Sequence, residues 1–428
     1  MTAAAAPRAA LQSRDFRLYL ASWLLTNLGA QMLAVAVGWQ VYATTHRALD
    51  LGYVGLAQFV PAFGFSLLAG HAADRFDRAR IVAGCNVVLA LCAVAFALIA
   101  WTGTASVAPI YVVLFFVGVA RAFEGPAAQA LVPSLVPPEH FPNAVTWGST
   151  VWQVSTIVGP SLGGVLYAAA HSAAWVYVGS GALLALAAAL LGPLPVCAPS
   201  GDAQGVSLKT VFAGFRYVQE NPVILGSISL DLFAVLLGGA TALLPLYASD
   251  ILHVGPWGLG VLRSAPAVGA AGMALGLAYR PLERRAGPIM LACVALFGGA
   301  TIVFGLSHNF ALSFASLLVL GASDMVSVVV RSTVVQLRTP HDMRGRVSAV
   351  NMMFVVASSE LGEMESGLTA AWLGAVPAVV VGGLATLLVV AIYTLIFADL
   401  RAVDRLEDAG RPAEERPLPV PAAAAPLE

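Results

Sequence analysis

Apolar stretches of about 20 residues recur along the chain, separated by short segments rich in charge, Gly and Pro. A helix of about that length crosses the ~30 Å hydrocarbon core of a bilayer. The pattern therefore predicts an all-α membrane protein with twelve transmembrane helices. The expected spans are Leu18–Tyr42, Leu51–Ala73, Ile81–Trp101, Val107–Ala128, Asn143–Ala170, Ala174–Val196, Pro222–Ser249, Trp257–Tyr279, Pro288–Leu306, Phe310–Leu337, Val347–Leu373 and Val376–Phe397.

The two ends of the chain lie outside these spans. Residues 1–13 are Ala-rich, and residues 401–428 mix charge with Pro and Ala and carry few apolar side chains. Such segments cannot bury enough apolar surface to offset the entropy of ordering. We expect both ends to be disordered and cytoplasmic.

Residues 197–220 form a polar cytoplasmic linker between the sixth and seventh spans. In its last part, apolar residues recur at helical spacing beside Lys209 and Arg216. This pattern predicts a short amphipathic helix on the inner leaflet. The apolar residues are Leu208, Val211, Phe212, Phe215 and Val218.

Composition excludes several classes of protein. Of the 428 residues, 59% are hydrophobic and only 11% are charged, whereas about a quarter are charged in soluble domains. The net charge of −1 gives no reason to expect a nucleic acid as a partner. The sequence has no nucleophile elbow, HExxH, phosphate-binding loop or Cys/His metal spacing. We therefore expect no enzyme activity, no metal, no cofactor and no direct use of ATP.

The basic residues predict the orientation in the membrane. Eighteen of the 22 Lys and Arg residues precede the first span, follow an even-numbered span within a loop, or follow the last span. Arg47 alone lies in a loop on the other side. Lys and Arg accumulate in cytoplasmic loops. We expect a multi-pass protein of the bacterial inner membrane with both termini in the cytoplasm.

Two pairs of segments repeat between the halves of the chain. Pro138–Val145, after the fourth span, looks like Pro340–Val347, after the tenth. Gly70–Arg75 looks more loosely like Gly276–Pro281. Six spans followed by six in parallel repeat is a layout of secondary transporters, so a small-molecule substrate is expected.

Three motifs resemble those of the major facilitator superfamily. Gly70-xxx-Asp74-Arg75-xx-Arg78-x-Arg80 is similar to the signature loop between spans two and three, with Asp77 where Gly is common. Arg121-xx-Glu124-Gly125 is similar to the membrane-embedded arginine motif, with Glu124 where Gln is usual. Gly159-Pro160-xx-Gly163-Gly164 is similar to the motif of exporters, with Ser155 where a further Gly is expected.

Other segments are similar to the branch that contains the enterobactin exporter and related secretion effectors. They are Ala130–Pro137, Asp342–Val347 and Glu360–Gly367. The resemblance implies two six-helix bundles, residues 14–196 and 221–400, around a central cavity, and we expect a monomer. It implies alternating access and proton-driven export of an amphipathic small molecule, a siderophore or a drug-like compound. The fold does not fix direction, so proton-coupled import of a small polar solute is the alternative.

The signature loop also has a physical interpretation. Asp74 ends the second span, and Arg75, Arg78 and Arg80 follow within six residues, which is enough for an ion-pair latch between bundles. The alternative is a charge cluster that only sets topology. In the exporter motif, missing side chains at three glycines allow another helix to approach, and Pro160 bends the span. That helix is either a rocking surface or a tightly packed contact.

Ionisable groups inside spans mark transport pathways because each costs about 2.5–3.5 kcal/mol to insert. Three arginines accompany six acids within the spans, so some acids are expected to be protonated. The proton-coupling candidates are Asp231, Glu360, Glu363, Arg121, Glu124 and Arg263. Asp231 has no partner near it in sequence, and Arg121 and Arg263 are expected to pair with the acids. The alternative is that Arg121, Asp324 and Arg331 lie near cytoplasmic ends and pair structurally.

Polar and aromatic residues on the spans that line the cavity in the resembling fold suit an amphipathic organic substrate. Each could instead serve packing between helices. The candidates are Asn27, Gln31, Gln58, Trp152, Gln153, Asp324, Asn351 and Phe354.

Overall fold

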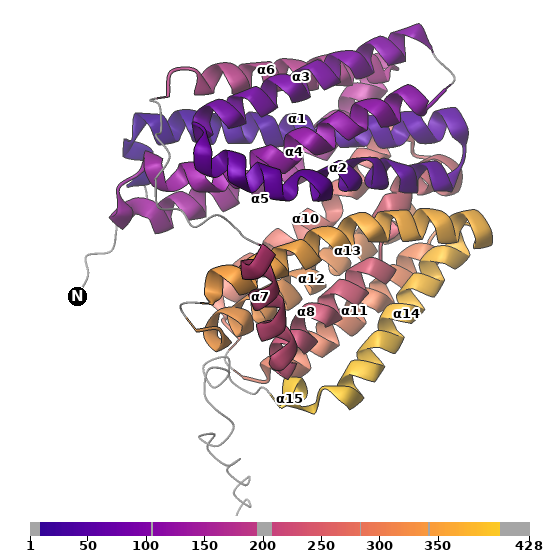
Figure 1. Cartoon of the computed structure of the whole chain (residues 1–428). Helices are drawn as coiled ribbons and strands as arrows, with labels where there is room; N and C mark the ends of the chain where they lie inside the picture. Colours follow the sequence, from indigo (N-terminus) through magenta and orange to yellow (C-terminus); the bar gives the residue numbers. More distant parts are fainter. Residues whose placement is uncertain (1–8, 104–105, 195–207, 283, 341–342, 403–428) are drawn as a thin grey trace, which may run out of the picture.

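The computed structural model describes residues 9–103, 106–194, 208–282, 284–340 and 343–402, and the regular secondary structure of these residues is entirely helical (Figure 1). The first half of the chain forms α1 (Arg14–Thr45), α2 (Ala48–Arg75), α3 (Arg78–Thr102), α4 (Ala108–Leu135), α5 (Phe141–Ala170) and α6 (Ala173–Leu191). The second half begins with α7 (Leu208–Glu220) and continues through α8 (Pro222–Leu237), α10 (Gly255–Tyr279), α11 (Ala286–Leu306), α12 (Phe310–Arg338), α13 (Arg344–Leu373), α14 (Ala375–Ile396) and α15 (Ala398–Arg401). The all-helical prediction is confirmed.

Local sequence explains where several helices begin and end. The Ser13 side chain accepts a hydrogen bond from the amide of Phe16 at the start of α1, and Asp77 accepts from two amides at the start of α3. Such caps satisfy amides that have no partner within the helix. At their other ends, α1 and α5 stop at His46 and His171, both in the left-handed conformation.

Ten of the described helical segments are long and apolar enough to cross a membrane. Nine of them are single helices or most of one, and the tenth is the run Pro222–Ile251. Helices α5 and α13 have 30 residues each but are not among the ten. The chain is therefore a multi-pass membrane protein. Helix α13 is continuous, but its apolar sequence is interrupted by the charged residues Glu360, Glu363 and Glu365.

The expected seventh span, Pro222–Ser249, is not one continuous helix. Helix α8 ends at Leu237, and after Gly238 and Gly239 the chain continues as a 3-10 turn, η3 (Ala240–Leu243), then α9 (Leu244–Leu246) and a π-turn, η4 (Tyr247–Ile251). Glycine is unfavourable inside a helix. A Cβ on Gly239 would also lie 2.8 Å from the Gly362 carbonyl oxygen of α13, so the break is packed against that helix.

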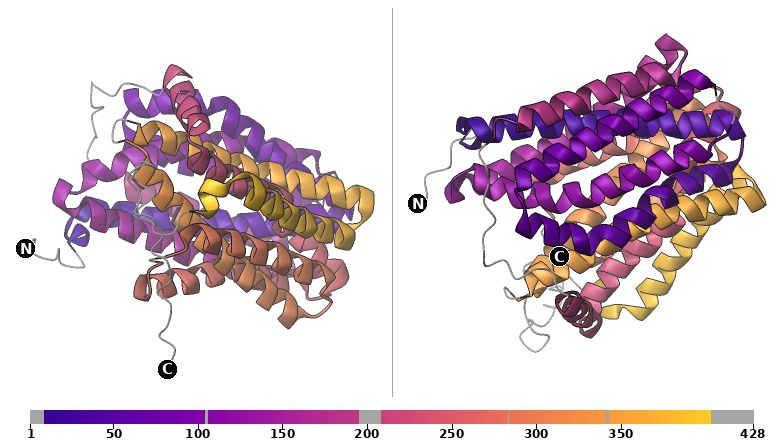
Figure 2. Two further views of the ribbon diagram at one scale, coloured as in Figure 1. Left: turned by 90° about the horizontal axis from the view of Figure 1, so that it is seen from below. Right: turned by 45° about the horizontal axis from the view of Figure 1, so that its top comes forward.

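The two halves repeat one packing pattern. In the first half, α2 packs on α4, α3 on α6, and α1 on both α5 and α6. In the second half, α10 packs on α12, α11 on α14, and α8 on both α13 and α14. Corresponding pairs have the same positions in chain order: α2 and α4 are the second and fourth membrane helices of the first half, and α10 and α12 are those of the second half. Figure 1 and the right view of Figure 2 show the first-half helices, indigo to magenta, on one side and most of the second-half helices on the other.

Contact between the halves runs mainly through two pairs of helices, α5 with α10 and α2 with α13, and α1 adds smaller contacts with α9 and α10. Glycines allow this close approach. A Cβ on Gly164 would lie 2.5 Å from the Pro256 carbonyl oxygen, and one on Gly260 would lie 2.4 Å from that of Pro160. On the other side, a Cβ on Gly367 would lie 2.8 Å from Cα of Gly52. Side chains at these positions would push the halves apart.

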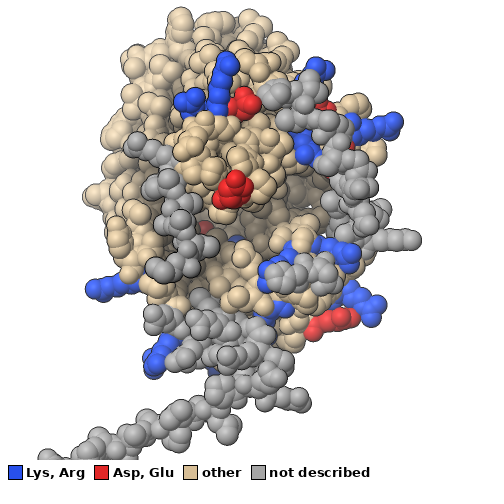
Figure 3. Space-filling view, turned by 90° about the vertical axis from the view of Figure 1, so that its left-hand side faces the viewer, with Lys and Arg blue, Asp and Glu red and all other residues tan. Residues whose placement is uncertain are grey.

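The two ends of the molecule differ. We call the end that holds the start of α1 and the α2–α3, α4–α5 and α12–α13 connections the terminal end, and the opposite end the far end. At the far end, the Tyr42 hydroxyl of α1 donates to Asp250 of η4, which joins the two halves. The terminal end is hollowed in its middle and has basic side chains around it, with charged atoms visible inside the hollow (Figure 3).

The linker helix α7 packs against the second half rather than standing free. Val218 is buried, Tyr217 donates from its hydroxyl to the Arg338 carbonyl oxygen at 2.9 Å, and a Cβ on Gly214 would lie 2.8 Å from the Arg346 carbonyl oxygen. Phe212 remains 67% exposed. The helix expected from the sequence is therefore present. One of its faces packs on α13, and Phe212 is exposed on its surface.

Part of the N-terminal segment is ordered, contrary to expectation. Residues 10–12 form a 3-10 turn, η1. The Ala10 amide donates to Asn143 Oδ1 at 3.1 Å, and the Ser13 hydroxyl donates to the Leu135 carbonyl oxygen at 2.9 Å. Because these partners lie on α4 and α5, the start of the chain is tied to both. The rest of the expected disordered ends, residues 1–8 and 403–428, and linker residues 197–207 lie outside the described residues.

Candidate functional site

A cavity of about 100 Å³ lies between the two halves, near the middle of the long helices, and four charged side chains line it. Arg121 comes from α4, Arg263 from α10, and Glu360 and Glu363 from α13. The remaining wall is contributed by α1, α2 and the segment η3–α9. One cation and no acid thus come from the first half, and one cation and both acids from the second.

The charges share the cavity without forming close ion pairs. In the described part of the chain, none of these four side chains lies within 4.0 Å of an opposite charge. All four side chains line the same open space. A proton, water or a polar part of a substrate can therefore come between them.

Glu363 packs closely against a glycine of the first half. A Cβ on Gly55 of α2 would lie 2.9 Å from Glu363 Oε2 and 3.1 Å from its Cβ. Glu360 and Glu363 are one helical turn apart and line the same cavity. Glu365 is not among the lining residues and accepts a hydrogen bond from Thr369 of its own helix at 2.6 Å. Two of the three α13 acids therefore face the cavity.

Glu124 lies one turn beyond Arg121 on α4 but is not among the residues that line this cavity. Its side chain is buried, and its Oε1 has no hydrogen-bond partner. Burying an unpartnered carboxylate is costly. Glu124 is therefore a buried acid outside the cavity that Glu360 and Glu363 line.

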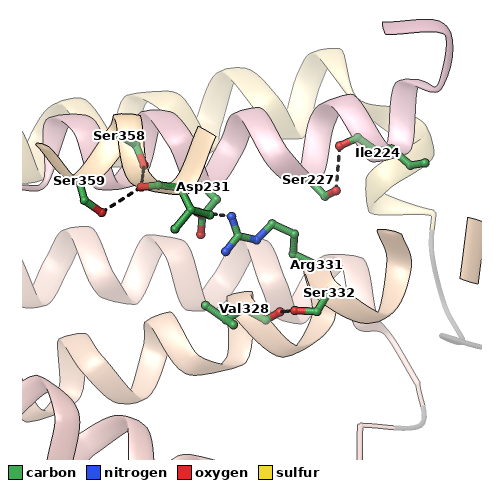
Figure 4. Close-up of polar contacts among 9 residues, drawn as sticks. Ile224, Ser227, Asp231, Val328, Arg331, Ser332, Ser358 and Ser359 are labelled. Atoms are coloured by element: carbon green, nitrogen blue, oxygen red, sulfur yellow. Dashed lines mark hydrogen bonds and ion pairs between the residues drawn. The ribbon is translucent and has the colours of Figure 1, made fainter. Parts of the chain in front are cut away.

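Asp231 has a partner that the sequence analysis did not assign. It forms a buried ion pair with Arg331 of α12, not with Arg121 or Arg263 (Figure 4). Both side chains are about 6% exposed. Arg331 therefore does not reach water at a helix end; it neutralises Asp231 inside the second half, because α8 and α12 are neighbours there.

Asp324 joins this second charged group. A space of about 10 Å³ is lined by Asp231, Asp324, Ser323 and Ser327. That is roughly the room needed for one water molecule. Asp324 was expected at the central cavity, but the structure places it here, within the second half.

The other expected cavity residues divide into several environments. Gln58 lines the charged cavity, and Trp152 and Gln153 line a larger one described below. Asn27 is buried and donates to the Trp23 carbonyl oxygen of its own helix at 2.7 Å. Gln31 packs against Gly159, Asn351 has a buried Oδ1 without a partner, and Phe354 stacks on Phe215 of α7 with 6.3 Å between ring centroids.

The signature-loop residues lie on two helices with a very short connection. Gly70, Asp74 and Arg75 belong to the last turns of α2, while Arg78 and Arg80 open α3. Arg78 Nη1 donates to the Ala130 carbonyl oxygen of α4 at 3.1 Å. Asp77, which departs from the usual glycine, caps α3 and lies 3.7 Å from Arg80.

The glycines of α5 face two directions. A Cβ on Gly159 would lie 2.6 Å from Gln31 Cβ, and one on Gly163 would lie 3.0 Å from Met32 Cα, both on α1. Gly164 instead meets α10 across the interface. The motif therefore lets α5 approach one helix within its half and one helix of the other half, with Pro160 at the crossing.

Two features of the site escaped the sequence analysis. One is the end of helix α8 at Leu237. The two adjacent glycines that follow it, inside an apolar stretch, could have indicated this break. The other is Gly55, whose packing against Glu363 depends on the contact between α2 and α13. Sequence spacing carries no signal for such a contact.

Paired sets of helices around a charged cavity define a membrane transporter. The chain belongs to the transmembrane secretion effector family of the major facilitator superfamily, whose family model matches residues 5–423. It is 26% identical to the enterobactin exporter EntS of Citrobacter koseri over 394 residues, which cover 90% of this chain and 92% of that protein. The corresponding protein of Shigella boydii is 25% identical over the same length.

Solved structures share the fold. A bacterial homologue of the human lysosomal transporter Spinster, in an inward-facing and unoccupied conformation, superposes with a TM-score of 0.69 at 15% identity, covering 96% of this chain and 99% of that one. The nucleoside transporter NupG gives 0.66 at 16% identity, covering 90% and 98%. Both are similar to this chain in fold alone.

Proposed function

We propose that this protein is a proton-coupled exporter that moves an amphipathic small molecule, a siderophore or a drug-like compound, by alternating access. It has twelve spans in two six-helix bundles, residues 14–196 and 221–400. It acts as a monomer in a bacterial inner membrane with both termini in the cytoplasm, so the terminal end faces the cytoplasm. The central cavity with Arg121, Arg263, Glu360 and Glu363 is the observation that supports the proposal most.

The cavity can couple a proton to movement of the halves. Glu360 and Glu363 repel each other on one face of α13, and a proton on either relieves the repulsion. A cation brought closer has the same effect. Arg121 sits on the other half, so its distance from the two acids changes when the halves move. Protonation and conformation then depend on each other.

Export is supported by the exporter-like glycine motif of α5 and by the likeness to EntS. The test compares a deletion strain with the same strain carrying the gene, using untargeted mass spectrometry of cells and medium. We expect at least one amphipathic compound to rise inside the deletion strain and fall in the medium. A compound that instead disappears from the cells and stays in the medium would show import and overturn the proposal.

Asp74 is proposed to latch the bundles when the terminal end closes. Asp74→Asn removes one partner of a charge-assisted contact and is expected to slow transport about tenfold. Membrane expression should not change, because Asp74 forms no ion pair with another described residue in this structure. Flux per molecule of protein is measured beside Glu220→Gln, which removes an exposed acid of α7. Equal flux in both variants would leave Asp74 with a topological role only.

A further inference from the structure

A second and larger cavity, of about 600 Å³, lies in the first half beside the charged one. It lies between α4 and α5, with α1 behind, and runs from Phe16 and Phe141 at the terminal end to Gly125 and Gln153. Its volume is typical of small-molecule sites. The described residues that line it include no Asp, Glu, Lys, Arg or His.

Small residues keep this cavity open. A Cβ added to Gly125 of α4 or to Gly148 of α5 would meet no atom of a neighbouring element within 4 Å. Further along α5, the glycines at 159, 163 and 164 are tightly packed. The C-terminal part of α5 therefore packs tightly against its neighbours, whereas the N-terminal part of α5 is separated from α4 by the cavity.

Four aromatic rings form one wall. Phe16 and Tyr19 have ring centroids 6.4 Å apart, and Tyr19 and Trp23 are stacked at 6.3 Å with 13° between their planes. Trp23 and Trp152 are stacked at 6.5 Å with 28° between planes, which joins α1 to α5. Trp152 ends the row and is 49% exposed. Another ring can extend the row there, because aromatic rings prefer partners at 4.5–7 Å.

The aromatic cavity adjoins the charged one. Arg121 lines the charged cavity and Gly125 the aromatic one, four residues or about one turn apart on α4. On the other side, Gln153 donates to the Ala267 carbonyl oxygen of α10 at 2.7 Å, one turn from Arg263. A ligand can therefore place an uncharged end in one cavity and a polar end in the other.

From these observations we infer that the aromatic cavity binds an uncharged planar aromatic group, and that the transported molecules are amphipathic compounds that carry such a group. The second part rests on the proposed export function. The first part concerns binding alone. An aliphatic group of the same size would fill the space but would not stack on Trp152.

Binding is measured by equilibrium dialysis of the full chain in lipid nanodiscs, with empty nanodiscs subtracted. The probes are 2-naphthol and decahydro-2-naphthol, which share a hydroxyl and a two-ring frame and differ in aromaticity. We expect 2-naphthol to bind about tenfold more tightly than its saturated counterpart. Trp152→Ala should remove that preference, and Trp152→Phe should keep most of it. Equal binding of the two probes to the unaltered protein overturns the inference.

Gly148→Leu tests the location by filling the cavity, and Gly84→Leu on α3 is its matched control because a Cβ there also meets no neighbour. Gly148→Leu should abolish 2-naphthol binding and Gly84→Leu should not. If Gly148→Leu binds normally, the site lies elsewhere. If it fails to fold, as judged by thermal unfolding, Trp152→Ala decides. Normal naphthol binding by a protein that exports nothing refutes the proposed function and leaves the binding site standing.

Discussion

Replacing Glu360 and Glu363 together with Gln is expected to end uphill transport while downhill exchange continues. The double amide keeps the shape of the cavity but cannot take up or release a proton there. Without coupling, substrate distributes passively, so its concentration ratio across the membrane should fall to about 1. The measurement is substrate accumulation in proteoliposomes with an imposed pH gradient, followed by counterflow without one. The two single amides show which carboxylate carries the proton.

Helix α13 supplies a matched control for this result. Glu365→Gln changes a third acid of the same helix, which is outside the cavity and bonded to Thr369. It should leave both accumulation and counterflow unchanged. If the Glu360/Glu363 variant still accumulates substrate along with the control, coupling lies elsewhere. Asp324 and Glu124 would then be the next acids to replace.

Removing the arginine of the buried ion pair should have the largest effect on stability. Arg331→Met leaves Asp231 without its partner and Asp324 beside it, and loss of one member of a buried pair costs about 3–5 kcal/mol. Asp231→Asn should cost less, because Asp324 lines the same small space and remains as an acid near Arg331. The stabilities of these variants are compared by the midpoint of thermal unfolding in detergent, which is monitored as the loss of monodisperse protein.

A rescue and a control separate this effect from general damage. The double variant Asp231→Asn with Arg331→Met should be more stable than Arg331→Met alone, because one uncompensated charge is gone. Arg216→Met breaks the exposed pair with Glu220 and should not change the midpoint measurably. If Arg331→Met unfolds at the same temperature as the unaltered protein, the buried pair has no structural role.

Much of the architecture could be predicted because the bilayer imposes one simple length requirement. The stretch expected at Ile81–Trp101 is α3, Arg78–Thr102, and the one expected at Pro288–Leu306 is α11, Ala286–Leu306. The prediction of one continuous seventh helix failed at Gly238 and Gly239, where the low helix propensity of glycine opposes the length requirement of the bilayer. There the stretch is long and apolar enough to span, but two glycines and a close neighbour end the helix.

The site was harder to predict because partners come from distant parts of the chain. Charge inside spans identified Arg121, Arg263, Glu360 and Glu363 as candidates, and the structure brings them to one cavity. The same reasoning assigned Arg121 and Arg263 as partners of the acids and missed the pair of Asp231 with Arg331, 100 residues away. Only the packing of α8 on α12 decides among them.

The interruption after Leu237 divides the seventh segment into two mechanical parts. Before the break, Asp231 is fixed to α12 through Arg331; after it, Asp250 is bonded to Tyr42 of the opposite half. A rigid helix would transmit any tilt of one end to the other, whereas a few glycine torsions absorb it here. Separation of the far end then breaks the Tyr42 hydrogen bond and the packing of α1 and α2 on this segment, without requiring the buried ion pair to break.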